Sequence, residues 1–273
     1  MPFRDGPDRV LIATRILSAV IIPFLVGAFI LLYFRPSADD TARLFAWRIA
    51  PEFTAMSLGS VYLGGAYFFL RAMFADEWHR IAGGFVPVGI FATLMGVATI
   101  IHWNRFIHTN VAFWLWAALY FTTPFLVFTV WWLNQKQAVG SSTDPEIARP
   151  VNVIIGVIGT LAAATSLFLF LFPAAAVAIW PWRLTELTAR VTGAMFALGA
   201  GAFSIVRDRR WSSAQLLLEV ALVMLGLLVI AAVRARHDFN PGNPLSWAFA
   251  VGFTAVGLGA VTLYVQIRRR QPH

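Results

Sequence analysis

Two related stretches of the chain determine its predicted fold: WRIAPEFTAMSLGSVYLGG at 47–65 and WRLTELTARVTGAMFALG at 182–199. In each, Trp-Arg is followed by Glu-x-Thr-Ala and then by glycines seven and thirteen residues after the glutamate. Each glutamate stands near the start of a long apolar segment and is the only carboxylate of that segment. The pattern predicts a duplicated chain in which each copy begins a helix.

The two halves also align outside these stretches. Identical residues lie 134 positions apart for Glu52, Thr54, Gly59 and Gly65, and 133 positions apart for Trp78, Phe106, Asn110 and Trp114. The alignment predicts a first repeat at 1–133, a cytoplasmic linker at 134–150 and a second repeat at 151–273.

The composition indicates a membrane protein. Of the 273 residues, 59% are hydrophobic and only 12% are charged, whereas about a quarter of a typical soluble chain is charged. The sequence has no cysteine, which excludes disulfides, cysteine-ligated metals and thiol nucleophiles.

Eight apolar segments are each close to the ~20 residues that a helix needs to cross hydrocarbon. Four such spans per half is an even number, so both halves begin on the same side of the membrane. The predicted fold class is therefore an all-α polytopic membrane protein with two parallel four-helix repeats. The expected spans are 10–33, 51–74, 80–101, 110–133, 151–172, 184–206, 213–233 and 246–267.

The basic residues predict the orientation. The side that holds both termini carries 13 of the 21 lysines and arginines, and the other side carries 8. Because cytoplasmic loops are richer in basic residues, both termini are expected in the cytoplasm. The same rule accounts for the net charge of +8 without a nucleic-acid partner. We expect a multi-pass protein of the cell membrane, in a bacterium the inner membrane.

The repeated stretches offer charged groups near the outer face. Arg48 and Glu52 are four residues apart, and Arg183 and Arg190 lie three and four residues on either side of Glu186. One interpretation is a pair of ligand sites that face an outer vestibule. The favoured interpretation is a helix start, in which glutamate complements the helix dipole and Trp47 and Trp182 belong to the interfacial aromatic belt.

Two further loops carry the remaining outer candidates. The first supplies His102, Arg105 and His108, and its repeat mate supplies Arg236, His237 and Asp238. The six-residue spacing of the first two histidines is not a usual metal-ligand spacing. We therefore expect hydrated loops that extend the polar cluster, with no metal and no cofactor.

Glu219 is the one carboxylate predicted well inside a span, about 12 Å along the helix from Trp211. An ionisable residue at that depth is a functional candidate by default. We expect an intramembrane pair with Arg15, which enters from the same side. The alternative is a proton or cation step along a transport path.

No catalytic constellation is recognisable, and the function stays open among three classes. The favoured one is a non-catalytic accessory or small-ligand-binding bundle with a charged outer vestibule. The alternatives are a small-solute or ion transporter that uses Glu219 and the repeat interface, and a membrane enzyme for a lipid-like substrate. Partners are expected among membrane lipids and other membrane proteins. The copies differ at Arg190 against Met56 and at Glu219 against Val86, so a specialised site is expected in the second half.

Overall fold

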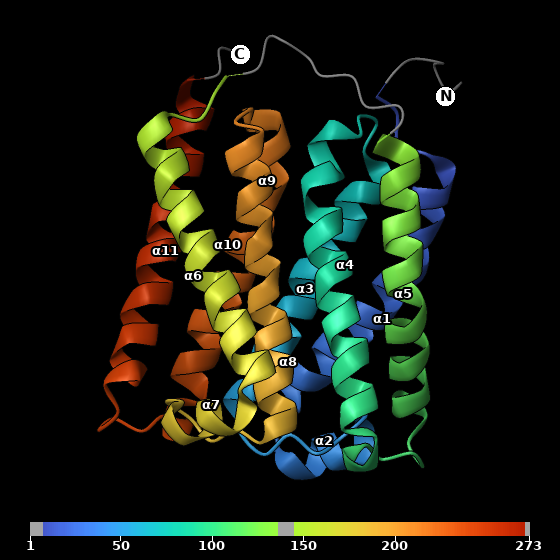
Figure 1. Ribbon diagram of the computed structural model, residues 1–273, viewed down its shortest axis with the longest axis vertical. Helices are drawn as coiled ribbons and strands as arrows, with labels where there is room; N and C mark the ends of the chain where they lie inside the picture. Colours follow the sequence, from blue (N-terminus) through green and yellow to red (C-terminus); the bar gives the residue numbers. More distant parts are fainter. Residues whose placement is uncertain (1–7, 136–144, 271–273) are drawn as a thin grey trace.

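The computed structural model describes residues 8–135 and 145–270, with only the backbone at 267–270. Within these ranges the regular structure is helical, apart from isolated β-bridges (Figure 1). Eight segments are long and apolar enough to cross a membrane, as predicted. They are α1 (Ile12–Phe34), α3 (Glu52–Phe74), α4 (His79–Ile101), α5 (Val111–Gln135), α6 (Arg149–Leu171), α8 with α9 (Glu186–Ala197 and Gly201–Arg207), α10 (Trp211–Arg234) and α11 (Pro244–Arg270).

The sixth predicted span is not one continuous α-helix. The 3₁₀ turn η2 (Leu198–Ala200) separates α8 from α9. Glycine is a weak helix former, and Gly199 lies within the break while Gly201 follows it directly. A side chain at Gly199 would come within 2.4 Å of the Ala162 side chain. The close approach of α6 therefore requires glycine where the helix is already weak.

Short helices connect the spans at the face opposite the chain ends. They are α2 (Ala38–Leu44) and α7 (Pro173–Ile179), with the 3₁₀ turns η1 (Trp103–Arg105) and η3 (Arg236–Asp238). The Ser37 side chain caps α2 by accepting from the Asp40 amide, and Pro173 starts α7, where its missing N–H costs nothing. We call this end the opposite face. The end where α1 begins and α11 ends is the termini face (Figure 1).

The halves interlock. Within each half the first two spans pack together, α1 on α3 and α6 on α8, as do the last two, α4 on α5 and α10 on α11. Between the halves, α3 packs on α10 and α4 packs on α8. The second span of each half thus lies against the third span of the other, and few contacts join α3 to α4 within the first half.

The repeated glycines lie where helices cross. A Cβ at Gly59 would lie 3.3 Å from the Tyr33 Cβ of α1, and one at Gly193 would lie 3.0 Å from the Ser166 carbonyl of α6. Small residues let helix backbones approach closely. The glycines therefore set the contact of the second span with the first in both halves.

The two repeated tryptophans are buried, which corrects their expected place in the aromatic belt. Trp47 is 2% exposed and Trp182 is 5% exposed. Rings from the connecting segments enclose them, such as Phe106 around Trp47 and Phe239 around Trp182. Exposed tryptophans are found instead at the starts of α5 and α11, where Trp114 is 56% exposed and Trp247 is 64% exposed.

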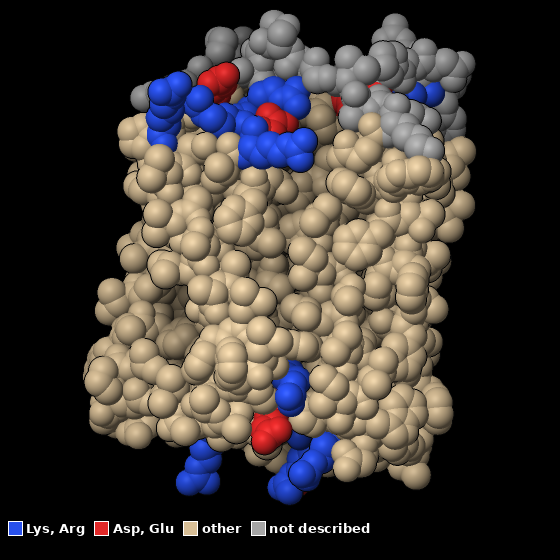
Figure 2. All heavy atoms as spheres, in the orientation of Figure 1, with Lys and Arg blue, Asp and Glu red and all other residues tan. Residues whose placement is uncertain are grey.

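Charged side chains gather at the two ends of the visible face and leave a broad band without charged side chains between them (Figure 2). Exposed large apolar side chains are frequent on α1, α5, α6 and α11. The distribution is that of a helical bundle surrounded by hydrocarbon.

Candidate functional site

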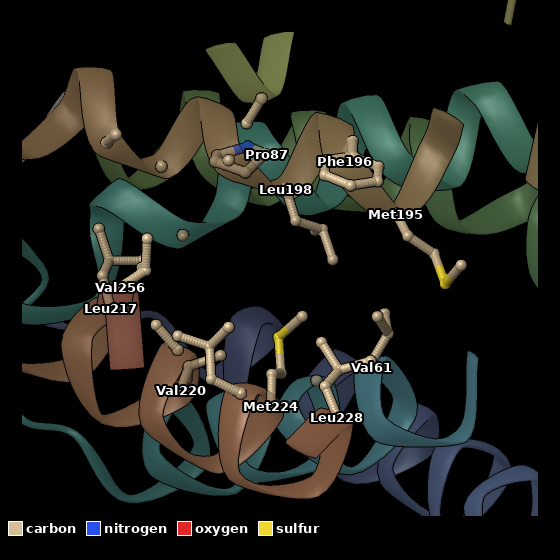
Figure 3. A pocket seen from close by; sticks show the side chains of 18 of the residues that line it. Val61, Pro87, Met195, Phe196, Leu198, Leu217, Val220, Met224, Leu228 and Val256 are labelled. Carbon is tan, nitrogen blue, oxygen red and sulfur yellow. The ribbon is translucent and has the colours of Figure 1, made fainter. Parts of the chain in front are cut away.

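A cavity of about 810 Å³ lies between the helices, within the range of small-molecule sites. Met195 and Leu198 of α8 and η2 border it from one side, and Val61, Met224 and Leu228 of α3 and α10 border it from the other (Figure 3). Both α6 and α11 also contribute to its walls. The walls are almost entirely apolar, so the cavity suits an apolar occupant.

Small residues and loose packing create this space. Gly201, Ala202 and Ala221 line the cavity, and a Cβ at Gly201 would make only ordinary contacts, the closest at 3.7 Å. On α11, Gly259 also lines the cavity and has nothing within 4 Å of an added Cβ. The missing side-chain volume therefore leaves the cavity between α6, α10 and α11 unfilled.

Few polar groups reach the walls. Tyr62 and Tyr120 both line the cavity, and their hydroxyls bond to each other at 2.9 Å. Ser57 and Thr192 border it toward the opposite face, and Thr262 and Gln266 toward the termini face. None of these carries a charge, so the cavity has no charged side chain in the walls that the structure describes.

Glu219 lies beside the cavity and its partner is Arg71, which corrects the expected pair with Arg15. One carboxylate oxygen accepts from the Arg71 guanidinium and from the Tyr67 hydroxyl at 2.7 Å. The other accepts from Gln215 at 2.8 Å and Tyr264 at 3.1 Å. Because four donors from α3, α10 and α11 surround it, the carboxylate joins these helices.

Arg15 instead stabilises the end of α3. Its guanidinium donates to the Met73 and Ala75 carbonyls at 3.2 and 2.8 Å and pairs with Asp76 at 3.4 Å. These are carbonyls that a helix C-terminus leaves without helical partners. Arg71 and Arg15 both come from the termini face, and the packing of α3 on α10 determines which one reaches Glu219.

The outer candidates form two separate groups, and each joins the two halves. In the first, Asp238 accepts from the Phe53 amide at 2.7 Å, while His237 lies 3.8 Å from Glu52 and 3.7 Å from Asp238. Asp238 thereby caps α3 from the other half. Glu52 is the first residue of α3, in agreement with the expected helix start, and the cap of this helix comes from Asp238 of η3.

In the second group, Arg190 donates to the Nε2 atom of His102 at 2.6 Å and lies 3.7 Å from Glu186. Burial, with the nearby Arg190 charge, lowers the pKa of His102. A neutral imidazole can accept this bond at Nε2, and a protonated one cannot. The group therefore joins α8 to the end of α4 through a neutral histidine.

The remaining outer candidates form no ion pair or hydrogen bond with these groups, although the Arg105 charge also lowers the pKa of His102. Arg48 lies 3.8 Å from the exposed Asp39, and His108 lies against the Trp103 and Phe113 rings. Arg105, Arg183 and Arg236 are exposed. Within residues 8–135 and 145–270, no three histidines or carboxylates come together as a metal site would require.

Sequence reasoning missed a buried cluster at the termini face. The Asp8 carboxylate accepts from the His79 amide at 3.1 Å and contacts its Nδ1 atom, and the His79 Nε2 atom lies 3.1 Å from the Ser212 hydroxyl. One available signal was the alignment of the halves, because His79 and Ser212 are 133 positions apart and follow the aligned Trp78 and Trp211. Asp8 caps α4 here, and the histidine joins α4 to α10.

The eight long apolar helices fit an integral, multi-pass membrane protein. No known protein family, no curated protein and no solved structure matches the chain. The arguments for its function therefore come from the geometry described above.

Proposed function

We propose that this is a non-catalytic membrane protein that binds an apolar, lipid-like ligand in the cavity between its two halves. The observation that carries the proposal is an apolar space of about 810 Å³ at the level of the spanning helices. An empty apolar space of this size would forfeit the van der Waals contacts of its walls. A ligand with a hydrocarbon chain would restore those contacts, and a polar solute would find few partners there.

Equivalent hydrogen bonds support the proposal that the chain is a tandem pair of parallel four-helix repeats. Trp78 donates from its backbone to Asp8, and the aligned Trp211 donates to Pro145, both at 2.9 Å. The indoles of Trp114 and Trp247 donate to the carbonyls of His108 and Pro241, at 3.0 and 3.1 Å. Such bonds would recur at aligned positions if one four-helix unit had been duplicated.

The orientation follows from the same architecture. With four spans in each repeat, both repeats would begin on the termini face. The sequence assigns 13 of the 21 basic residues to that side, so we propose that it faces the cytoplasm and that the two outer groups lie on the other side. The protein would then be a multi-pass component of the cell membrane.

The polar groups support binding without transport or catalysis. All four donors around Glu219 are engaged in bonds that hold α3, α10 and α11 together. A carboxylate that carries a proton or cation along a path needs partners that it can exchange. The Glu219 network therefore favours a structural role beside the ligand site.

Filling the cavity tests the proposal. Ala221 lines the cavity on α10, so Ala221→Trp should occupy the space of the ligand. Ile230 is 51% exposed on the same helix, so Ile230→Trp is the matched control on the lipid-facing surface. Native mass spectrometry of the purified protein should show a bound lipid-like molecule in the parent and the control and not in Ala221→Trp. Equal binding in all three would refute the proposed site.

A further inference from the structure

We propose that the ligand is an anionic phospholipid of the leaflet at the termini face. One acyl chain enters the cavity between α6 and α11, and the phosphate binds Arg149 and Arg207. This inference rests on the proposed function and specifies its ligand and the route by which the ligand enters.

The opening is between α6 and α11. Ile154 and Ile158 of α6 and Val256 and Gly259 of α11 line the cavity, while α6 packs on α8 and α9 and α11 packs on α10. A hollow is visible on the surface between the positions of α6 and α11 (Figures 1 and 2). The opening therefore faces the hydrocarbon, and its occupant must come from the bilayer.

In the first half, a polar connection closes the equivalent position, which lies between α1 and α5. There, buried Asn134 at the end of α5 donates to the Thr14 hydroxyl of α1 at 2.7 Å and accepts from the Leu11 amide at 3.0 Å. The aligned glycines Gly59 and Gly193 contact Leu32 and Tyr33 of α1 and Leu169 and Phe170 of α6, so α1 corresponds to α6 at 137 positions. Thr14 then corresponds to Val151, and Asn134 corresponds to Ile267 at 133 positions. Valine and isoleucine side chains cannot form hydrogen bonds, so these two positions cannot supply the polar connection that holds α1 to α5.

Two arginines beside the opening could bind the headgroup. Arg149 begins α6 and Arg207 ends α9, and the helices meet there through a 3.3 Å bond from Asn152 to the Val206 carbonyl. Nearby Arg209 and Arg210 are paired with Glu146 and Asp208. Arg149 and Arg207 are exposed and make no ion pair or hydrogen bond with the residues that the structure describes.

The spacing suits one lipid molecule. Val151 and Ile154, the cavity-lining residues of α6 that lie nearest this end, are two and five residues from Arg149, or about 3 and 7.5 Å along the helix at 1.5 Å per residue. A phosphate held at Arg149 would therefore place its acyl chains at the level where the cavity begins. Basic side chains are visible above α6 and α9 at this end, and the surface below them is uncharged (Figure 2). Basic side chains above an uncharged surface indicate a ligand with an anionic headgroup and an apolar chain.

Quenching by labelled lipids tests the inference in the full-length protein. Because the chain has no cysteine, Val256→Cys can carry a single bimane fluorophore beside the opening of the cavity and Ile230→Cys one on the lipid-facing surface. The proteins are reconstituted in phosphatidylcholine vesicles that contain doxyl-labelled phosphatidylglycerol or doxyl-labelled phosphatidylcholine with the same chains. The bimane at 256 should be half-quenched at an about thirtyfold lower fraction of phosphatidylglycerol than of phosphatidylcholine, the order expected for two arginines near a phosphate.

Arg149→Gln with Arg207→Gln should abolish this preference, and either lipid should still quench the bimane at 256. Arg35→Gln with Arg43→Gln, the same charge change at the opposite face, should keep the preference. Equal quenching by the two lipids in the parent, or a preference that survives the first pair of exchanges, would overturn the phospholipid inference alone. A bimane at 256 that neither lipid quenches would overturn the proposed function as well.

Discussion

At the scale of single residues, the two outer groups are structural connections between the halves. Asp238 caps α3 and Arg190 binds His102, so each charged group holds a helix end of the other half. Arg190 has Met56 as its counterpart in the first half. The difference between the copies therefore strengthens the contact of α8 with α4.

The His102 bond predicts a pH dependence of stability. The folded-state pKa of His102 is lowered by burial and by Arg190, whereas an unfolded histidine has a pKa of about 6.5. Between these two pKa values the unfolded chain binds more protons, so the free energy of unfolding should fall as the pH drops through about 6.5. Thermal unfolding in detergent between neutral and mildly acidic pH measures this slope.

The control for this prediction is His102→Gln, which lacks the titrating group. Its unfolding temperature should depend less on pH than that of the parent over the same interval. His237→Gln serves as the comparison for loss of a histidine at the opposite face. If the parent and His102→Gln show the same pH slope, His102 does not contribute in the way described.

The Glu219 network predicts a coupling that separates the observed partner from the expected one. In a double-mutant cycle of Glu219→Gln with Arg71→Gln, the coupling energy should lie in the range of about 0.5–3 kcal/mol found for contacting residues. The cycle with Arg15→Gln should give a value near zero. Unfolding of the purified variants in detergent supplies the energies, and a larger coupling to Arg15 would contradict the structure.

At the scale of elements, helix crossings depend on the repeated glycines. Gly193→Ala would place a Cβ 3.0 Å from the Ser166 carbonyl and 3.1 Å from the Leu169 Cβ. Overpacking of this kind costs about 1–3 kcal/mol, so the variant should unfold at a lower temperature. Gly226→Ala on α10 meets nothing within 4 Å and should be as stable as the parent or slightly more stable. Equal destabilisation by both exchanges would show that the crossing is not responsible.

The eight spans could be predicted from the sequence because the length of an apolar run is itself the physical requirement for crossing a bilayer. The partner of Glu219 could not, since Arg15 and Arg71 enter from the same face and only the packing of α3 on α10 distinguishes them. The Asp8–His79–Ser212 cluster joins three distant segments for the same reason. The cavity depends on side-chain volume that is missing between helices, and no local sequence pattern predicts it.

At the scale of the whole molecule, the interlocked halves predict mutual dependence. Because α3 packs on α10 and α4 on α8, each half alone would expose two apolar surfaces that its partner normally covers. Separate expression of 1–140 and 141–273 should give aggregated or degraded products, and co-expression should give a complex that purifies through a tag on either piece. A stable monomeric half with a cooperative thermal transition would contradict the interlocked arrangement.

The central claim is that a lipid chain occupies the cavity between the halves. A structure of the protein determined by cryo-electron microscopy in lipid nanodiscs tests this most directly. We expect elongated density that runs from the termini face between α6 and α11 and ends among Met195, Leu198 and Met224. Wall side chains that close on one another, or a hydrated path through the space, would contradict the claim.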